Sequence, residues 1–310
     1  LEELVGGALS FYAAAAVAKS GGVHLFVAED RDAAAYLMND FYNLLDEERV
    51  CFFPSSWKRS AVYGAEDAQG VVQRTATMNA LRGFPGKGYL VVCTYPEALA
   101  ERVADADTLR KGTISVRVGD KISIEVLEQE LVDAAFTRVD FVYEPGQYSV
   151  RGGIVDVFSY SESKPYRLDF FGDEVDSIRT FDPESQRSIE QVDEAVIYPA
   201  TEMALTPEQI QDGTEAIEKD RRKYVKKLRD AMKTEEAYRM DSAVSEVLEG
   251  LREGFRVHGL GSYIRYFCKE TVSFLNYFPV DELTIFLDEP LRLKEKAETT
   301  ETEFRESMSH

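Results

Sequence analysis

The sequence predicts an α/β protein, in which a parallel-sheet domain is joined to a smaller inserted α+β domain with a mainly antiparallel sheet. Over residues 1–112, short apolar runs alternate with helical patterns, which is typical of a parallel sheet covered by helices. Over residues 113–199, short strand-like runs separated by Gly and Pro turns replace that pattern. A lone apolar run, Leu283–Leu287, can complete a sheet begun earlier in the chain.

Residues 1–112 supply the elements expected for the parallel sheet. The apolar stretch Ala8–Ala18 predicts a helix. Asp30 is placed to cap a second helix, Asp32–Leu45, whose apolar residues recur every three or four positions. Buried strands are expected at Val23–Val27, Val50–Phe53 and Tyr89–Thr94.

The rest of the chain predicts three further regions. Residues 113–199 form the α+β domain, with a helix at Glu125–Ala135. Its strands are expected at Val139–Val142, Gln147–Arg151, Ile154–Tyr160, Tyr166–Phe171 and Val175–Phe181. Residues 200–290 predict a highly charged helix, Pro207–Lys233, a more amphipathic helix, Glu235–Arg252, and then the closing strand. Residues 291–310 predict a charged helix or frayed tail.

Composition restricts the functions that the chain can have. Its 310 residues carry a formal charge of -20, so on average it repels phosphates and is not expected to bind DNA as a duplex-binding domain does. No apolar run approaches the ~20 residues of a membrane span. Three cysteines lie far apart without a C-x-x-C pair, so we expect no zinc site or disulfide framework and a cytoplasmic location.

A glycine pair opens the first helix, where a phosphate-binding loop could lie. The segment holds Gly6, Gly7, Ala8 and Ser10. A working loop needs a lysine followed by Ser or Thr to bind phosphates and Mg²⁺, and this segment has none. We therefore expect a degenerate P-loop-type domain without a cofactor. No nucleophile, base and orienting group can be assembled elsewhere, and no metal ligands are assigned, so no catalytic residue is expected.

Strand parity predicts an outward-facing group of side chains in the middle domain. In Tyr166–Phe171, Arg167 and Phe171 share the face opposite Leu168, and Arg151 shares the corresponding face of Gln147–Arg151. Arginine and aromatic residues together are common in interface hot spots. The alternative is that Phe171 folds into a second small core and both arginines pair with nearby acids.

The same stretch resembles a family signature. Residues 145–158, PGQYSVRGGIVDVF, resemble the P-G-x-Y-x-x-R-G-G-[IL]-[ILV]-D-[ILV]-[FY] motif shared by UvrB and the transcription-repair coupling factor (Mfd), and residues 165–188 resemble its continuation. The missing lysine favours Mfd over UvrB. So does the short distance from Trp57 to Arg74, which leaves no room for the DNA-gripping hairpin of UvrB.

The resemblance implies a function and a division of the chain. It makes residues 1–112 domain 1a, 113–199 the UvrA-binding domain 2 and 200–290 domain 1b. It implies a non-catalytic module that docks on UvrA through Arg151, Arg167 and Phe171, and so recruits nucleotide excision repair to stalled RNA polymerase. Binding of RNA polymerase and DNA, and use of ATP and Mg, would belong to other domains of the full-length protein. The alternative is an ATP-dependent UvrB-like DNA-repair helicase.

Overall fold

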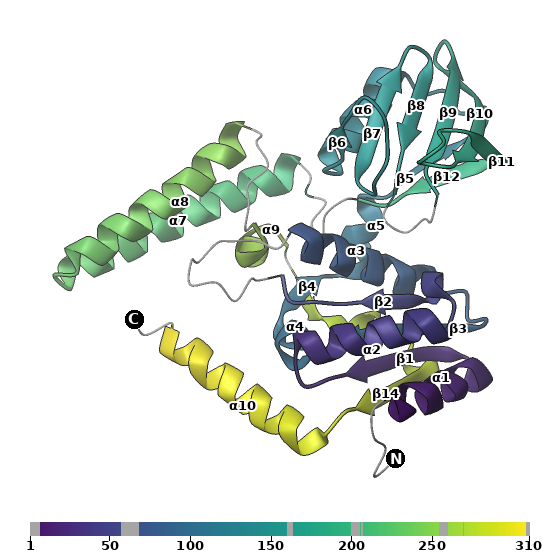
Figure 1. Ribbon diagram of the computed structural model, residues 1–310. Coiled ribbons are helices and arrows are strands. Elements are labelled where there is room, and N and C mark those ends of the chain that lie inside the picture. The colour runs from purple at the N-terminus through teal and green to yellow at the C-terminus, as the bar shows by residue number, and fades with distance from the viewer. Residues whose placement is uncertain are drawn as a thin grey trace.

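The chain forms two separate sheet-containing parts and a projecting pair of helices. A computed structural model describes residues 7–56, 68–159, 164–199, 205, 207–253, 260–268 and 270–307. Figure 1 shows the parallel sheet with its helices, the second sheet beside it, and the helical pair α7–α8 extending away from both. Among the described helices, none is both long and apolar enough to cross a membrane.

The first part is built on a four-stranded parallel sheet in the order β14-β1-β3-β2. The strands are β1 (Gly22–Val27), β2 (Val50–Phe52), β3 (Tyr89–Thr94) and β14 (Leu283–Leu287). Leu25 lies opposite Ile285 in the β1–β14 pairing, although 260 residues of chain separate them. The predictions of a parallel sheet and of a closing strand far along the chain are therefore confirmed.

Helices surround this sheet, and their starts follow from local sequence. They are α1 (Ala8–Ser20), α2 (Arg31–Leu44), α3 (Ala68–Gly83), α4 (Pro96–Ala100) and α5 (Ala106–Lys111), with the 3₁₀ turn η1 (Glu47–Arg49). Asp30 caps α2 as predicted, since its carboxylate accepts a hydrogen bond from the Ala33 amide at 2.9 Å. That bond satisfies a helix-terminal donor that has no partner within the helix.

Aromatic pairs connect the late segment of the chain to the early sheet. Phe286 stacks on Phe26, with ring centroids 4.3 Å apart, and Phe274 stacks on Phe53 at 3.5 Å. Phe53 and Phe274 are both fully buried. The strand and turns of this segment are β13 (Thr271–Ser273), η3 (Phe274–Tyr277) and η4 (Val280–Glu282), and β13 pairs antiparallel with β4 (Arg102–Ala104). Residues separated by more than 220 positions thus form one core.

The second part is a six-stranded sheet in the order β11-β10-β9-β8-β7-β6. Its strands are β6 (Thr137–Arg138), β7 (Gln147–Arg151), β8 (Ile154–Val157), β9 (Tyr166–Phe171), β10 (Glu174–Phe181) and β11 (Ser188–Val192). All its pairings are antiparallel except β6–β7. The helix α6 (Ile124–Asp133) belongs to this part, as does a two-stranded sheet of β5 (Ile114–Arg117) and β12 (Glu194–Ile197). The mainly antiparallel sheet was predicted, but β5, β6, β11 and β12 were not.

One predicted strand is wrong. Val139–Val142 is not a strand. Instead it packs on the sheet, because Val139 and Val142 form a small apolar cluster with Phe158 and Phe181. The alternating apolar residues that suggested a strand therefore serve packing against another surface.

The last part consists of helices. The paired helices are α7 (Pro207–Asp230) and α8 (Thr234–Glu253), followed by η2 (Leu260–Tyr263) and α9 (Ile264–Phe267). The helix α10 (Pro290–Ser307) ends the described chain. Leu293 on α10 is buried in the core of the first part, and Lys296 lies 4.0 Å from Glu97 of α4. The start of α10 is therefore docked, and only the helix option of the predicted helix or tail holds.

Candidate protein-docking site

The candidate site lies on the face of the second sheet that turns away from its main core. Strand register brings its members together, because Asp156 of β8 lies between Ser149 of β7 and Arg167 of β9. Alternate residues point to opposite faces. Val155, Val157 and Leu168 therefore enter the core, while Asp156 and Arg167 lie on the opposite face.

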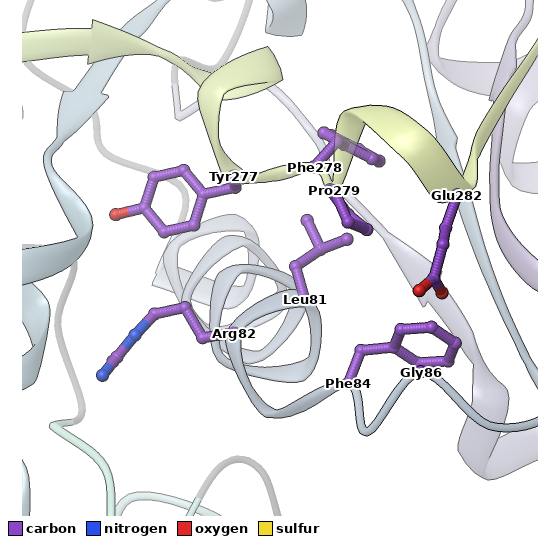
Figure 2. Close-up of a pocket in the computed structure, with 8 residues that line it drawn as sticks. All are labelled: Leu81, Arg82, Phe84, Gly86, Tyr277, Phe278, Pro279 and Glu282. Carbon is purple, nitrogen blue, oxygen red and sulfur yellow. The ribbon is translucent and has the colours of Figure 1, made fainter.

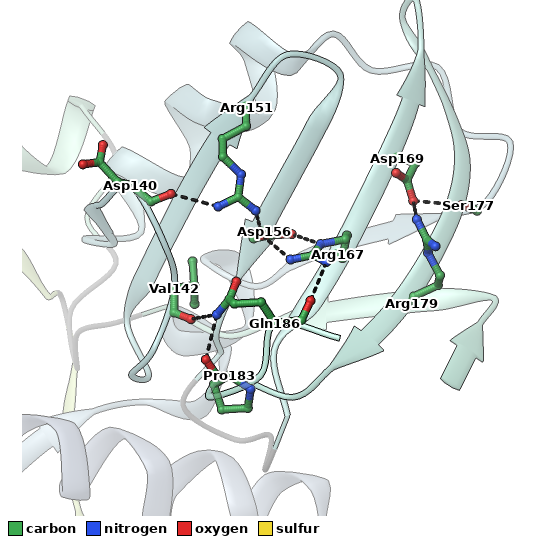
Figure 3. Close-up of polar contacts among 10 residues, drawn as sticks. All are labelled: Asp140, Val142, Arg151, Asp156, Arg167, Asp169, Ser177, Arg179, Pro183 and Gln186. Atoms are coloured by element: carbon green, nitrogen blue, oxygen red, sulfur yellow. Dashed lines mark hydrogen bonds and ion pairs between the residues drawn. The ribbon is translucent and has the colours of Figure 1, made fainter. Parts of the chain in front are cut away.

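Two arginines converge on one carboxylate on this face (Figure 3). Arg167 donates from Nε to Asp156 Oδ1 at 2.7 Å and from Nη2 to Oδ2 at 2.8 Å, and Arg151 Nη2 donates to Oδ2 at 2.5 Å. We call Arg151, Asp156 and Arg167 the arginine clamp. The Asp156 side chain is fully buried, whereas those of Arg167 and Arg151 are 13% and 34% exposed. Hydrogen bonding to Asp156 raises the pKa of Arg167, so the clamp is a fixed group of charges.

Neighbouring groups hold each guanidinium in place. Arg167 lies over the ring of Phe181, 4.3 Å from its centroid, and donates to the Gln186 carbonyl at 3.1 Å. Arg151 lies 4.7 Å from the centroid of the Phe141 ring and donates to the carbonyl of residue 140 at 2.9 Å. Such cation–π contacts are typically worth about 0.5–2 kcal/mol, depending on desolvation. Both arginines are therefore preorganised.

Phe171 stands at the corner of the same face. It ends β9, and Gly172 follows with φ 64°, a backbone conformation that glycine adopts without strain. Its side chain is 85% exposed, the highest value of any aromatic residue that the structure describes. Next to it, Asp169 binds Arg179 and accepts a hydrogen bond from Ser177 at 3.1 Å (Figure 3).

The structure thus brings the three predicted residues to one face but gives them different roles. Phe171 points outward as parity predicted. Arg167 is mostly covered, so the expectation that both guanidinium groups turn fully outward is too simple for it. Asp156 was missed, although its alternation with Val155 and Val157 in the strand placed it beside Arg167.

The segment expected to be a degenerate phosphate loop is described only in part. Gly6 lies outside the described residues. Gly7 occupies the N-cap position of α1, where no side chain caps the helix. Ser10 is buried, and its hydroxyl donates to Asp40 Oδ2 of α2. The Ser10 hydroxyl is therefore engaged in a bond between α1 and α2.

A pocket of about 340 Å³ lies elsewhere, between the end of α3 and the segment before β14 (Figure 2). Leu81, Phe84, Tyr277 and Phe278 supply most of its apolar lining, and Glu282 is its one carboxylate. No histidine or cysteine lines it, so the lining residues offer no nucleophile and base pair.

Comparison with known proteins identifies the part that carries the site. Residues 114–203 match the family model described as the UvrB interaction domain. This part of the chain is therefore similar to UvrB interaction domains. Its extent includes the second sheet, the arginine clamp and Phe171. The domain therefore supplies the whole of the candidate docking face.

Sequence comparisons over most of the chain extend the similarity beyond the residues that match the UvrB interaction domain. The chain is 29% identical over its whole length to the transcription-repair-coupling factor of Bacillus subtilis, of which it spans 26%. It is 30% identical over 203 residues to that of Escherichia coli, spanning 17% of that protein. It is also 27% identical to the UvrABC system protein B of Kosmotoga olearia over 86% of the chain, spanning 42% of that protein. The resemblance expected from the motif is confirmed, and these relatives are considerably longer than the chain.

Proposed function

We propose that this chain is a non-catalytic docking module that binds UvrA through the outer face of its UvrB interaction domain. The observation that carries the proposal is the exposure of Phe171 on the same sheet face as a preorganised pair of arginines. Burying a phenylalanine side chain stabilises by about 1.5–3 kcal/mol. An exposed ring at a sheet corner therefore offers free energy that a partner can gain by covering it.

The chemistry of the face suggests what the partner surface contains. A guanidinium has five N–H donors, and Arg167 uses three of them in the bonds described above. The N–H groups of Arg167 that these bonds do not use favour carboxylates, which arginine can bind in bidentate geometry. We propose that UvrA offers an apolar pocket for Phe171 with acidic groups at its rim.

The surrounding charge is part of the same proposal. A chain of charge -20 repels most acidic surfaces. Two arginines fixed on one face allow approach only of a partner whose acidic groups match them in position. Specificity for UvrA would then come from geometry as well as from attraction.

The role proposed for the full-length protein follows from its relatives. Two of them are transcription-repair-coupling factors. We propose that the module recruits nucleotide excision repair to stalled RNA polymerase in the cytoplasm. RNA polymerase binding and an ATP- and Mg-dependent motor would lie in other domains. All three cysteines are free thiols, in keeping with a reducing compartment.

The alternative, an ATP-dependent UvrB-like helicase, is supported less well. The loop lacks the required lysine, and Ser10 is bonded to Asp40. A nucleotide titration separates the two functions. Micromolar affinity for ATP in this chain would favour the helicase, and no saturable binding is expected for the docking module.

Calorimetric titration with purified UvrA tests the proposal. We expect Phe171→Ala to weaken binding by at least about 2 kcal/mol, roughly thirtyfold, as for other aromatic hot spots. The matched control is Tyr36→Ala, because Tyr36 is also an exposed aromatic residue, at 76%, but lies on α2. Equal affinities of the two variants would refute the proposed face.

A further inference from the structure

The helix α7 carries a concentration of positive charge in an otherwise acidic chain. Between residues 219 and 230 the sequence holds seven basic and two acidic side chains, a net charge of +5. The basic residues are Lys219, Arg221, Arg222, Lys223, Lys226, Lys227 and Arg229. The remaining chain is correspondingly more acidic than its total of -20 suggests, so charge is strongly segregated.

Five of these residues form one continuous solvent-exposed surface. At 100° per residue, Lys219, Arg222, Lys223, Lys226 and Lys227 fall within an arc of about 140° around the helix, and all five are exposed. We call this set the lysine stripe. Among the described residues, no carboxylate lies within ion-pair distance of its four lysines, whereas Arg222 contacts Glu218 at 2.7 Å.

The other basic residues of the segment serve the fold. Arg221 faces α8, where Nη1 contacts Asp241 at 2.5 Å and the Ser245 hydroxyl at 3.0 Å. It also forms an ion pair with Glu218 on its own helix. Arg229 lies 3.8 Å from Asp241. These contacts fix the rotation of α7 against α8, so the stripe is directed away from the helical pair.

The helical pair presents the stripe at a distance from the acidic body. Near the start of α7, Gln209 donates to the Phe267 carbonyl of α9 at 3.3 Å. Just past the middle of α7, Asp220 accepts a hydrogen bond from the Tyr266 hydroxyl of α9 at 3.0 Å. From that level the stripe runs outward along the projecting arm that Figure 1 shows. At 0.1 M salt the screening length is about 10 Å. Charges on the two sheet-containing parts that lie farther than this from the stripe are therefore largely screened, and the nearest negative charges outside α7 itself are those of α8, which packs along α7.

We propose that the lysine stripe binds the phosphate backbone of duplex DNA. The stripe extends eight residues, about 12 Å along the helix axis. Duplex DNA presents one negative charge per ~1.7 Å, so several phosphates lie within its length. A helix fits the major groove of B-form DNA, about 12 Å wide, and cations spread over about 140° face both groove walls. The net charge of the whole chain is -20, and this total does not reveal a local basic surface.

Other polyanions fit the stripe less well. Single-stranded nucleic acid is usually held by several aromatic side chains that stack on bases, whereas α7 contributes one exposed aromatic side chain, Tyr224, whose ring centroid lies 5.6 Å from Lys223 Nζ. A-form RNA has a deep and narrow major groove that a helix does not enter. Protein interfaces are depleted in lysine and enriched in aromatic residues, whereas four of the five stripe residues are lysines.

Fluorescence anisotropy with a labelled 20-base-pair DNA duplex measures this binding over a salt series. With five phosphate contacts, the slope of log affinity against log salt is about -4.5, so affinity falls by several hundredfold between 50 and 200 mM KCl. Replacing the four lysines by Gln leaves Arg222 alone and reduces the slope to about -1. Gln has nearly the helix propensity of Lys, and circular dichroism and thermal melting verify that the arm stays folded.

The matched control replaces four exposed lysines outside the arm by Gln, giving the same net charge. These are Lys19, Lys87, Lys121 and Lys294. This control is expected to bind like the unaltered chain. Equal loss in both variants, or no binding at 50 mM KCl, would overturn the proposal. So would equal affinity for single-stranded DNA, duplex RNA or polyglutamate, because each would show that the stripe does not select the DNA duplex.

Discussion

Replacing Asp156 by Asn perturbs the clamp at its buried centre without changing side-chain size. Three bonds from two guanidinium groups end on this carboxylate, which is inaccessible to solvent. Breaking a buried ion pair by removing one partner typically costs about 3–5 kcal/mol, because the other charge loses its compensation. Arg151 and Arg167 retain some contact with water, so we expect the low end, about 3 kcal/mol.

The change can be measured by urea unfolding, together with hydrogen exchange of the strands that carry the clamp. With a urea dependence of about 1–3 kcal/mol per molar, a loss of about 3 kcal/mol lowers the midpoint by roughly 1–2 M. Hydrogen exchange is needed to assign that loss to β7, β8 and β9, because proteins with several domains commonly depart from two-state unfolding.

The matched variant is Asp169→Asn on the same face. Asp169 pairs with Arg179, but the two side chains are 22% and 38% exposed. Exposed pairs contribute about 0–1 kcal/mol, so a small loss is expected. If Asp156→Asn destabilises no more than Asp169→Asn, the clamp does not hold the sheet and our reasoning is wrong.

Three further predictions concern the helices. Gly213→Ala is expected to destabilise the chain by about 1–3 kcal/mol in a urea melt, since an added Cβ would overlap the ring of Phe267 and overpacking outweighs the gain in helix propensity. Leu293→Ala is expected to cost about 2–5 kcal/mol in the same assay, because this side chain is 7% exposed in the core. Hydrogen bonding from Arg221 lowers the pKa of Glu218 to about 2, so circular dichroism is expected to show α7–α8 losing stability as pH falls from about 4.5 towards 2.

Each of these has its own control. Leu291→Ala should be nearly neutral, because Leu291 is 80% exposed on the same helix, and equal effects at the two leucines would mean that α10 is not docked. For Gly213, a stability gain near 1 kcal/mol would show that the ring moves aside. Because a lowered pKa stabilises only above that pKa, Glu218→Gln should flatten the acid dependence, and an unchanged profile would assign it to another group.

Local sequence determined the elements whose periodicity and caps are self-contained. Asp30 caps α2 because its carboxylate reaches an amide three residues away, and such a bond depends on no distant segment. Strand alternation likewise placed Arg167 and Phe171 on one face, and the glycine turns fixed where β9 ends. The family motif in residues 145–158 could be recognised because it is also local, combining turn residues with alternating apolar positions.

Tertiary structure decided how those faces are covered. Parity could not tell that Val139 and Val142 pack on Phe158 and Phe181 rather than forming a strand, or that Arg167 is mostly buried against the same ring of Phe181. Burial depends on which distant segments meet. The direction of the lysine stripe also depends on such contacts. The sequence by itself sets periodicity and side-chain chemistry. Which side chains are exposed is decided only when segments far apart in the chain pack together and cover some of them.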